Sequence, residues 1–391
     1  LVLAAALAIL AACESDSAAD KNILFEVDGK PGNIDPQLAE NDTELMIARN
    51  TFEGLCRIDE EGAPAPALAE DVVVEGNKYT FTLKNKLKWH DDTPLTSADV
   101  VFGLRRALLP ETRAPFAQRL YSIKNARAVH EGTLPPDKLG VTAPDERTVV
   151  IELKSRDNDF LSVLADPVAM PCNEAFFDST KGRYGLSAEN ILCNGAFYVR
   201  RWDGEEYVGI SRNDRYRTLK VRPASVGIWF ARDPKYRAAR LDDGRCDAAV
   251  ASSGLSDGAL GIGLTPQLLY DCAWVIVLNP ANKSFSDARI RSAFMRSVDH
   301  ADYLGSMAEP LIEANALIPP GLNLRAQNFR DYAGYGSPKP YEPQAAKNAY
   351  HAAVAGGFSP DTFELLFAGD KAQKDVASRI AQSWQHNLGA V

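Results

Sequence analysis

The chain has 391 residues, of which 46% are hydrophobic and 24% charged, and its formal net charge is −9 at pH 7. This composition is typical of a globular protein, and the length predicts two or three domains. The acidic balance argues against a nucleic-acid partner, because phosphate backbones are bound by clustered Lys and Arg. No metal site is expected, since the five histidines are scattered and no two cysteines form a C-x-x-C pair.

An apolar segment opens the chain. Residues 1–12 are uninterruptedly apolar, which is too short to span a membrane but typical of the core of a signal peptide. The run ends in two alanines directly before Cys13 and so resembles a bacterial lipobox. We therefore expect Cys13 to carry a lipid that anchors the protein to the cell membrane, with residues 13–21 as a polar tether. The alternative is an ordinary secretory signal with an incidental cysteine.

Residues 79–110 carry the strongest local pattern in the chain. Apolar residues occupy every second position of 79–83, which predicts a half-buried strand. A turn follows at 91–94. Thr96 and Asp99 then have the spacing of a capping box, and the apolar helical face behind them ends before Pro110.

Further elements follow from periodicity and turn signals. Strands are expected at 22–27, 148–153, 207–212, 226–230, 247–250, 275–278 and 362–367. Helices are expected at 44–51 (capped by Asp42 or Thr43), 158–165, 234–241, 287–298, 345–355 and 371–388. Residues 226–250 read as strand, helix and strand, which predicts a βαβ unit with parallel pairing.

The stretch 79–110 resembles the signature of the extracellular solute-binding proteins of ABC importers, in the peptide-binding cluster known as family 5. Other family motifs recur in order and at family spacing. They are matched by residues 33–36, 52–55 and 65–70 upstream and by residues 194–197, 243–247 and 285–293 downstream. The resemblance covers nearly the whole chain after about residue 23.

The resemblance implies an α/β fold of the periplasmic-binding-protein type (class II, cluster C). Mixed sheets flanked by helices would form three lobes, with the ligand cleft between lobes I and III. Lobe I would comprise residues 22–51 and 173–278, and lobe II would be inserted at 52–172. Lobe III would start at 279 and be incomplete at 391, so roughly the last quarter of a typical member is expected to be absent.

The function implied by the resemblance is capture of oligopeptides or dipeptides outside the cytoplasm, in the periplasm or at the cell surface, and delivery to an ABC permease. Such a protein would be a monomer and would need no cofactor. Other solutes known for the family remain alternatives, namely nickel chelates, haem, oligosaccharides and opines. Two other classes also stay open: a secreted serine hydrolase and a surface protein that binds without transport.

Ligand contacts are implied at three places. These are Glu40, Asn41 and Asp42 in the loop before the first helix, Ala251, Ser252 and Ser253 after the strand at 247–250, and Trp274. The alternative for the first group is a plain N-cap cluster, and Trp274 could equally be a core residue. The aspartate that usually pairs with the peptide α-amino group would lie beyond Val391.

Two short patterns could suggest catalysis. Residues 254–258 match G-x-S-x-G with Ser256 as nucleophile, but the glycines that follow make a poor helix start. A flexible glycine loop is the favoured interpretation. His90 with Asp91 and Asp92 could form an acid–base pair or a metal site, although the end of a strand followed by a turn explains the same residues.

The remaining cysteines could form disulfides in an exported protein. Cys172 and Cys193 would bridge one loop, and Cys246 and Cys272 would form a second bridge. Spacing alone does not fix the connectivity, and Cys56 makes the count odd.

Overall fold

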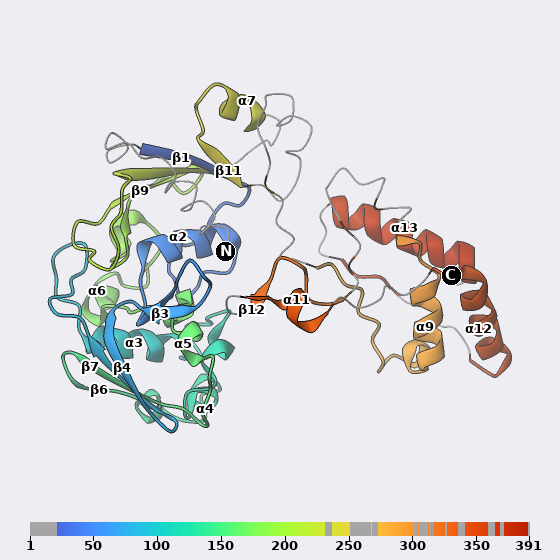
Figure 1. Cartoon of the computed structure of the whole chain (residues 1–391), viewed down its shortest axis with the longest axis horizontal. Helices are drawn as coiled ribbons and strands as arrows, with labels where there is room; N and C mark the ends of the chain where they lie inside the picture. The colour runs from blue at the N-terminus through green and yellow to red at the C-terminus, as the bar shows by residue number, and fades with distance from the viewer. Residues whose placement is uncertain are drawn as a thin grey trace. The chain divides into compact units, whose positions relative to one another are not determined.

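A computed structural model of the protein describes residues 22–230, 237–250, 267, 273–300, 304, 312, 314, 316–324, 327–334, 341–358, 364–367 and 371–389. The predicted signal peptide and Cys13 lie outside these residues. The chain divides into two compact units, residues 1–264 and residues 265–391 (Figure 1). The two units are described separately, and the predicted boundaries of the three lobes stay predictions.

Unit 1 contains two larger sheets, and the first is a five-stranded mixed sheet. Its order is β11-β1-β10-β9-β8, in which β1 runs parallel to β10 and β11 and the other pairings are antiparallel. The bounds are β1 Asn22–Val27, β8 Phe197–Trp202, β9 Tyr207–Arg212, β10 Ser225–Phe230 and β11 Ala248–Val250. The predicted βαβ unit is present, with α7 (Arg237–Asp242) as its helix. However, β10 and β11 do not pair with each other, because β1 lies between them.

A four-stranded antiparallel sheet, in the order β4-β5-β7-β6, forms the second layer of unit 1. Its strands are β4 Ala69–Glu75, β5 Lys78–Leu83, β6 Val141–Asp145 and β7 Thr148–Glu152. Helix α3 (Ser97–Ala107) packs against β6 and β7. As predicted, α3 begins with a capping box, in which the Asp99 carboxylate accepts the amide hydrogen of Thr96 at 2.8 Å.

Shorter elements connect and cover the two sheets. The helices are α2 Asp42–Thr51, α4 Ala126–His130, α5 Phe160–Val163 and α6 Glu174–Ser179, and β2 Cys56–Ile58 pairs with β3 Pro64–Pro66. Buried side chains of both sheets belong to one continuous hydrophobic core, which includes Phe81 and Trp89. Residues of the predicted lobes I and II therefore share one core.

A buried charge pair links these two predicted lobes. Asp35, in the loop after β1, accepts two hydrogen bonds from the Arg106 guanidinium of α3, one of them at 3.1 Å from Nη1. Arg106 Nη1 also donates to Gln37 at 2.6 Å. The guanidinium lies over the rings of Phe177 and Tyr184, at 4.5 and 5.1 Å from their centroids. Planar stacking and a carboxylate partner together satisfy a charge that would otherwise be costly to bury.

Gly103, one turn before Arg106, is required by this packing. A Cβ atom at this position would lie 2.4 Å from the carbonyl oxygen of Met170. The carbonyl oxygens of Gly103 and Met170 also accept hydrogen bonds from Nε2 of the Gln37 side chain, at 2.5 Å for Gly103 and 3.3 Å for Met170. The same small set of residues thus brings α3, the loop after β1 and the segment at Met170 together.

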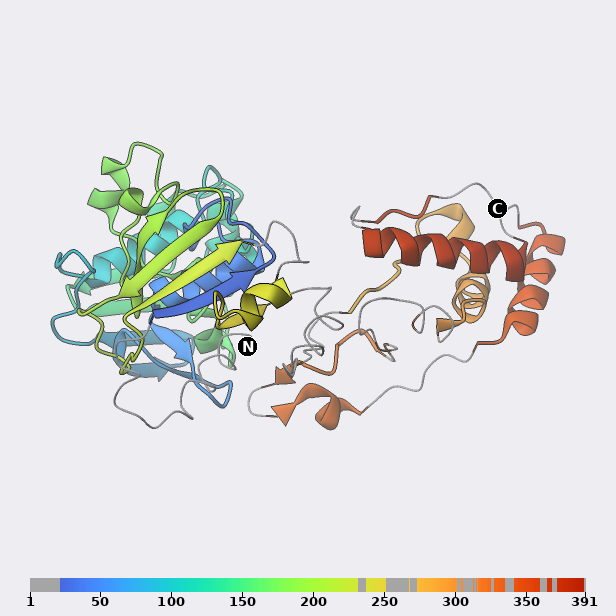
Figure 2. The same cartoon turned by 90° about the horizontal axis from the view of Figure 1, so that it is seen from above.

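Unit 2 has a helical core. Its principal helices are α9 Ala288–Arg296, α12 Pro343–Ala355 and α13 Lys371–Leu388, and it also contains α11 Phe329–Ala333 and the β12–β13 hairpin, Asn323–Leu324 with Gln327–Asn328 (Figure 2). Phe294 packs against Tyr350 and Trp384, and the Trp384 indole donates to the Phe294 carbonyl oxygen at 3.0 Å.

Two strand predictions in unit 2 are wrong for the residues that the structure describes. Residues 275–278 and 364–367 are assigned to no strand. Val277 and Leu366 are more than 80% exposed. Their apolar sequence favours a strand, but strands are stabilised by cross-strand neighbours, and among the described residues these segments have none.

Replacing Asp35 with Asn should destabilise unit 1 strongly. The variant leaves the Arg106 charge buried without an opposite charge, which costs about 3–5 kcal/mol in comparable pairs. Urea unfolding measures the loss of unfolding free energy. As a control, Glu152→Gln removes a surface carboxylate that pairs with Lys124 at 2.9 Å, and should cost less than about 1 kcal/mol. Equal losses for the two variants would contradict the role of the buried pair.

Candidate functional site

The carboxyl edge of the parallel strands is the candidate functional site. Val27 of β1 is in register with Phe230 of β10 on one side and with Val250 of β11 on the other, so the three strands end at the same level. The segment after β1 leads at this edge into the loop before α2. In open α/β sheets, ligands bind outside the carboxyl ends of the strands, where neighbouring connections diverge. Two of the three predicted contact groups follow these strands in the sequence.

The first group, Glu40 to Asp42, lies where the loop after β1 enters α2, and Asp42 is the first residue of the helix. Asn41 is the N-cap of α2, and its side chain accepts the Glu44 amide hydrogen at 3.0 Å. The cap is therefore Asn41, and the prediction of Asp42 or Thr43 is wrong. The side chains of Glu40, Asn41 and Asp42 are all exposed. The N-cap interpretation is confirmed for Asn41, whereas contact of this group with a ligand stays a prediction.

The loop is held from inside by the buried carboxylate of Glu44. One oxygen accepts amide hydrogens from Gly32 at 2.7 Å and Asn33 at 3.4 Å. The other accepts those of Glu40 at 2.8 Å and Asn41 at 3.3 Å. Sequence analysis missed this residue, although the Asn41–Glu44 spacing is that of a capping box. The backbone amides of Glu40 and Asn41 are thus already engaged within the protein.

The other predicted ligand contacts are only partly described. Ala251, Ser252 and Ser253 follow the last residue of β11 and lie outside the described residues. Trp274 is described, and its side chain is 43% exposed. It belongs to unit 2 and is not a buried core residue, which removes the alternative of a core role.

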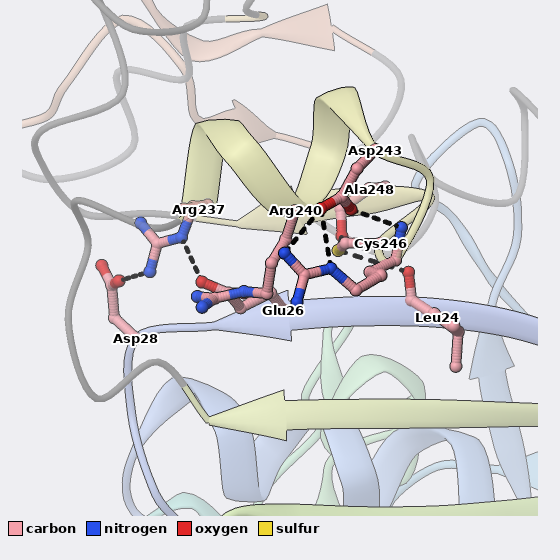
Figure 3. A network of polar contacts seen from close by, with 9 residues as sticks. Leu24, Glu26, Asp28, Arg237, Arg240, Asp243, Cys246 and Ala248 are labelled. Atoms are coloured by element: carbon pink, nitrogen blue, oxygen red, sulfur yellow. Dashed lines mark hydrogen bonds and ion pairs between the residues drawn. The ribbon is translucent and has the colours of Figure 1, made fainter.

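A network of charged side chains joins α7 to the end of β1 (Figure 3). The carboxylate of Glu26, on the penultimate residue of β1, is 1% exposed and binds the guanidinium groups of Arg237 and Arg240. Arg237 also binds Asp28, the first residue after β1. Sequence analysis missed these residues, and no local motif marks them.

The predicted disulfide between Cys172 and Cys193 is absent, because both residues are free, buried thiols. Each sulfur lies in its own packed environment, that of Cys172 beside Tyr184 and Arg106 and that of Cys193 beside Thr51. Burial raises the pKa of both thiols to about 12, so neither is a ready nucleophile.

Of the second predicted disulfide, the structure describes one cysteine, Cys246. Cys246 is a buried free thiol that donates to the carbonyl oxygen of Ala248 at 2.9 Å. Burial raises its pKa to about 11. Its predicted partner Cys272 lies outside the described residues.

His90 has a structural role, as the second of its two interpretations predicted. Its Nδ1 accepts the amide hydrogen of Cys193 at 3.1 Å, and its ring stacks on Tyr198 at 4.8 Å. Burial lowers the pKa of the imidazole, despite the nearby charge of Asp91. His90 therefore joins the turn after β5 to the segment before β8.

No group of three or more His, Cys, Asp or Glu side chains in the described part of the chain could hold a metal ion. None of the helices described is long and apolar enough to cross a membrane. Ser256, the candidate nucleophile, is not among the described residues.

Comparison with known proteins identifies relatives over most of the chain. The family of bacterial extracellular solute-binding proteins, family 5 Middle, matches residues 63–390. The dipeptide-binding protein DppE of Bacillus subtilis is 25% identical over 388 residues, which is 96% of this chain and 70% of that protein. The probable deoxycholate-binding periplasmic protein YgiS of Escherichia coli is 28% identical and covers 92% of this chain and 68% of its own length.

Solved structures agree in fold. The substrate-binding domain of an oligopeptide ABC transporter from Bacillus anthracis has a TM-score of 0.76 and 27% identity, covering 95% of this chain and 74% of that chain. OppA of Haemophilus influenzae, solved in complex with RPPGFSPFR, has a TM-score of 0.75 at 23% identity, and the match covers 95% of this chain and 74% of that chain.

The His90 contact predicts a loss of stability in mild acid. Because the pKa is lowered in the folded state, the unfolded chain binds the proton first as the pH falls below about 6.5. His90 thus contributes stability above that pH, and the contribution decreases as the pH falls toward the folded-state pKa. The variant His90→Gln should show a flatter profile there, by at most about 1.4 kcal/mol per pH unit.

Urea unfolding at a series of pH values measures this difference. The matched control is His386→Gln, because the His386 side chain is exposed at the end of α13, and it should keep the wild-type slope. A His90→Gln profile that is parallel to the wild-type profile between pH 5 and 6.5 would contradict the prediction.

Proposed function

The chain belongs to the bacterial extracellular solute-binding proteins of family 5, and on that premise we propose that it captures short peptides for an ABC importer. It is a binding protein and not an enzyme, so the G-x-S-x-G pattern at Ser256 receives no catalytic role. The observation that carries the proposal is the family match over residues 63–390. Relatives named for dipeptides and for oligopeptides support the choice of ligand.

The mechanism is recognition of an extended peptide by groups that do not depend on its sequence. Strand-like pairing of main-chain groups supplies affinity, and pockets for side chains add preference. We place the lobe I contacts at the carboxyl edge of β1 and β11, with Trp274 as a further contact. Lobes I and III then close over the ligand. Closure is driven only by the difference in ligand affinity between the closed and open states.

The capping arrangement restricts how the loop before α2 can contact a peptide. The amides of Glu40 and Asn41 already donate to Glu44 and are not free for a ligand strand. The exposed carboxylates of Glu40 and Asp42 are therefore the groups that this segment offers. Carboxylates suit the donor groups of a peptide, including its cationic end.

Export and anchoring complete the proposal. Relatives such as the murein peptide-binding protein MppA of Escherichia coli are named as periplasmic proteins. We place this protein outside the cytoplasm, held to the membrane by a lipid on Cys13 and delivering its ligand to the permease as a monomer. Labelling with an alkyne fatty acid in a bacterial host tests the anchor, because the variant Cys13→Ser should lose the label and appear in the soluble fraction.

Mass spectrometry of ligands that co-purify with the native protein tests the ligand class. A mixture of short peptides is the expected result. Recovery of a single non-peptide compound would overturn the peptide assignment, whether it is a steroid acid, a metal chelate, haem or an oligosaccharide. The peptides recovered then serve as probes for affinity measurements.

The double variant Glu40→Ala, Asp42→Ala should weaken binding of such a peptide about tenfold or more. Hydrogen bonds to charged groups contribute about 1.5–3 kcal/mol, and about 1.4 kcal/mol corresponds to a tenfold change in affinity. Isothermal titration calorimetry measures the change. The control Glu60→Ala, Glu61→Ala removes two exposed acids from the turn between β2 and β3, and should bind as wild type. Equal affinities for the two double variants would remove Glu40 and Asp42 from the site.

A further inference from the structure

The segment that forms α7 and β11 has few apolar contacts with the rest of unit 1: Cys246 is buried, and Val250 packs against the core while only partly buried. None of the three residues of β11 is fully buried. Of the α7 side chains that the structure describes, Arg237 is buried and the others are partly or fully exposed. Among the strands that the structure describes, β11 is an outer strand of its sheet and β1 is its one partner. Polar contacts therefore carry most of the task of holding this segment in place.

The carboxylate of Glu26 is the centre of those contacts (Figure 3). Its Oε1 accepts a hydrogen bond from Arg237 Nε at 3.0 Å, and its Oε2 accepts one from Arg240 Nε. The two arginines are three residues apart, so they lie on the same face of α7. A single acid of β1 thus binds both cations of one helical turn.

The contacts of Glu26 with Arg237 and Arg240 are called the Glu26 clamp below. Arg237 extends this clamp to the loop that follows β1. The Arg237 side chain is fully buried, and its Nη2 donates a hydrogen bond to the Asp28 carboxylate. Asp28 immediately follows β1 and opens the loop that leads to Glu40 and α2. The guanidinium therefore fixes the exit of β1 and the start of α7 relative to each other.

The segment between α7 and β11 is also hydrogen-bonded to β1. Asp247 accepts the amide hydrogen of Leu24 with Oδ2 at 2.7 Å and donates its own amide hydrogen to the Leu24 carbonyl oxygen at 2.8 Å. The Cys246 amide donates to the Arg240 carbonyl oxygen at 3.0 Å. β11 is therefore held at its start by Asp247 and from the helix side by the clamp on Glu26.

We propose that Glu26 is a positioning residue that sets ligand affinity through Arg237 and Arg240, without touching the ligand. The clamp holds β11 in register with β1 and so places the backbone at the carboxyl edge of the sheet. Its effect on affinity rests on the proposed function, whereas its effect on β11 does not. Without the Glu26 charge, both guanidinium groups lose their common partner and α7 is held mainly by Asp28.

The experiment compares wild type with Glu26→Gln, which keeps the shape of the side chain and removes its charge. Hydrogen–deuterium exchange should be about tenfold faster, or more, for amides of residues 246–250. Amides of β5 should exchange as in wild type, which separates a local effect from global unfolding. Affinity for a co-purified peptide should fall about tenfold, since displaced binding groups cost energy on closure.

Two further variants keep the test decisive. Arg240→Gln removes the less buried cation and should give a smaller change of the same kind if Glu26→Gln folds poorly. Arg245→Gln removes an exposed arginine of the same segment, which pairs with Asp243, and should change neither measurement.

Unchanged exchange at residues 246–250 in Glu26→Gln would overturn the positioning role. Faster exchange with unchanged peptide affinity would overturn the link to the ligand. If wild-type protein binds no peptide at all, the proposed function fails and the affinity part of this proposal fails with it. The exchange rates would still decide whether the clamp positions β11.

Discussion

The packing of unit 1 depends on one buried charge pair, Asp35 with Arg106. Asp35 lies in the loop that leaves the sheet of β1, and Arg106 lies on the helix that covers the other sheet. A buried guanidinium tolerates few arrangements, because it needs a carboxylate in its plane and apolar or aromatic groups above it. The pair therefore fixes the loop after β1 from one side while Glu44 holds it from the other. Glu40, at the end of this loop, and Asp42, at the start of α2, are therefore held with little freedom.

Local structure in unit 1 could largely be predicted from the sequence, because its signals lie within a few residues of one another. The alternation at 79–83 and the capping box at Thr96 give β5 and α3 as expected. Prediction failed where a residue distant in the sequence determines whether a segment forms a strand. The apolar residues 275–278 resemble a strand in isolation, but a strand is stable only with neighbours. Asp42 or Thr43 was predicted as the cap in place of Asn41, because Asn, Asp and Thr are all preferred capping residues.

The candidate site was predictable only in part, for the same reason. The contacts assigned to Glu40, Asn41 and Asp42 came from a family motif next to them in the sequence, and the structure shows that all three side chains are exposed at the start of α2. Glu26 and Arg237 are 211 residues apart, and no short pattern connects them. The disulfide expected between Cys172 and Cys193 failed because closeness in sequence does not bring two sulfurs together when each packs against different neighbours.

The strands at the carboxyl edge of the β1 sheet are held in two different ways, by apolar packing and by polar contacts. β1 and β10 are anchored by buried apolar residues, and such close-packed parts transmit strain and move as rigid units. β11 is anchored mainly by charges and hydrogen bonds, which can be weakened one at a time and leave the core intact. Segments of low local stability are where proteins place the elements that respond to ligands. The clamp on Glu26 joins these two parts, because it binds α7 to the end of β1.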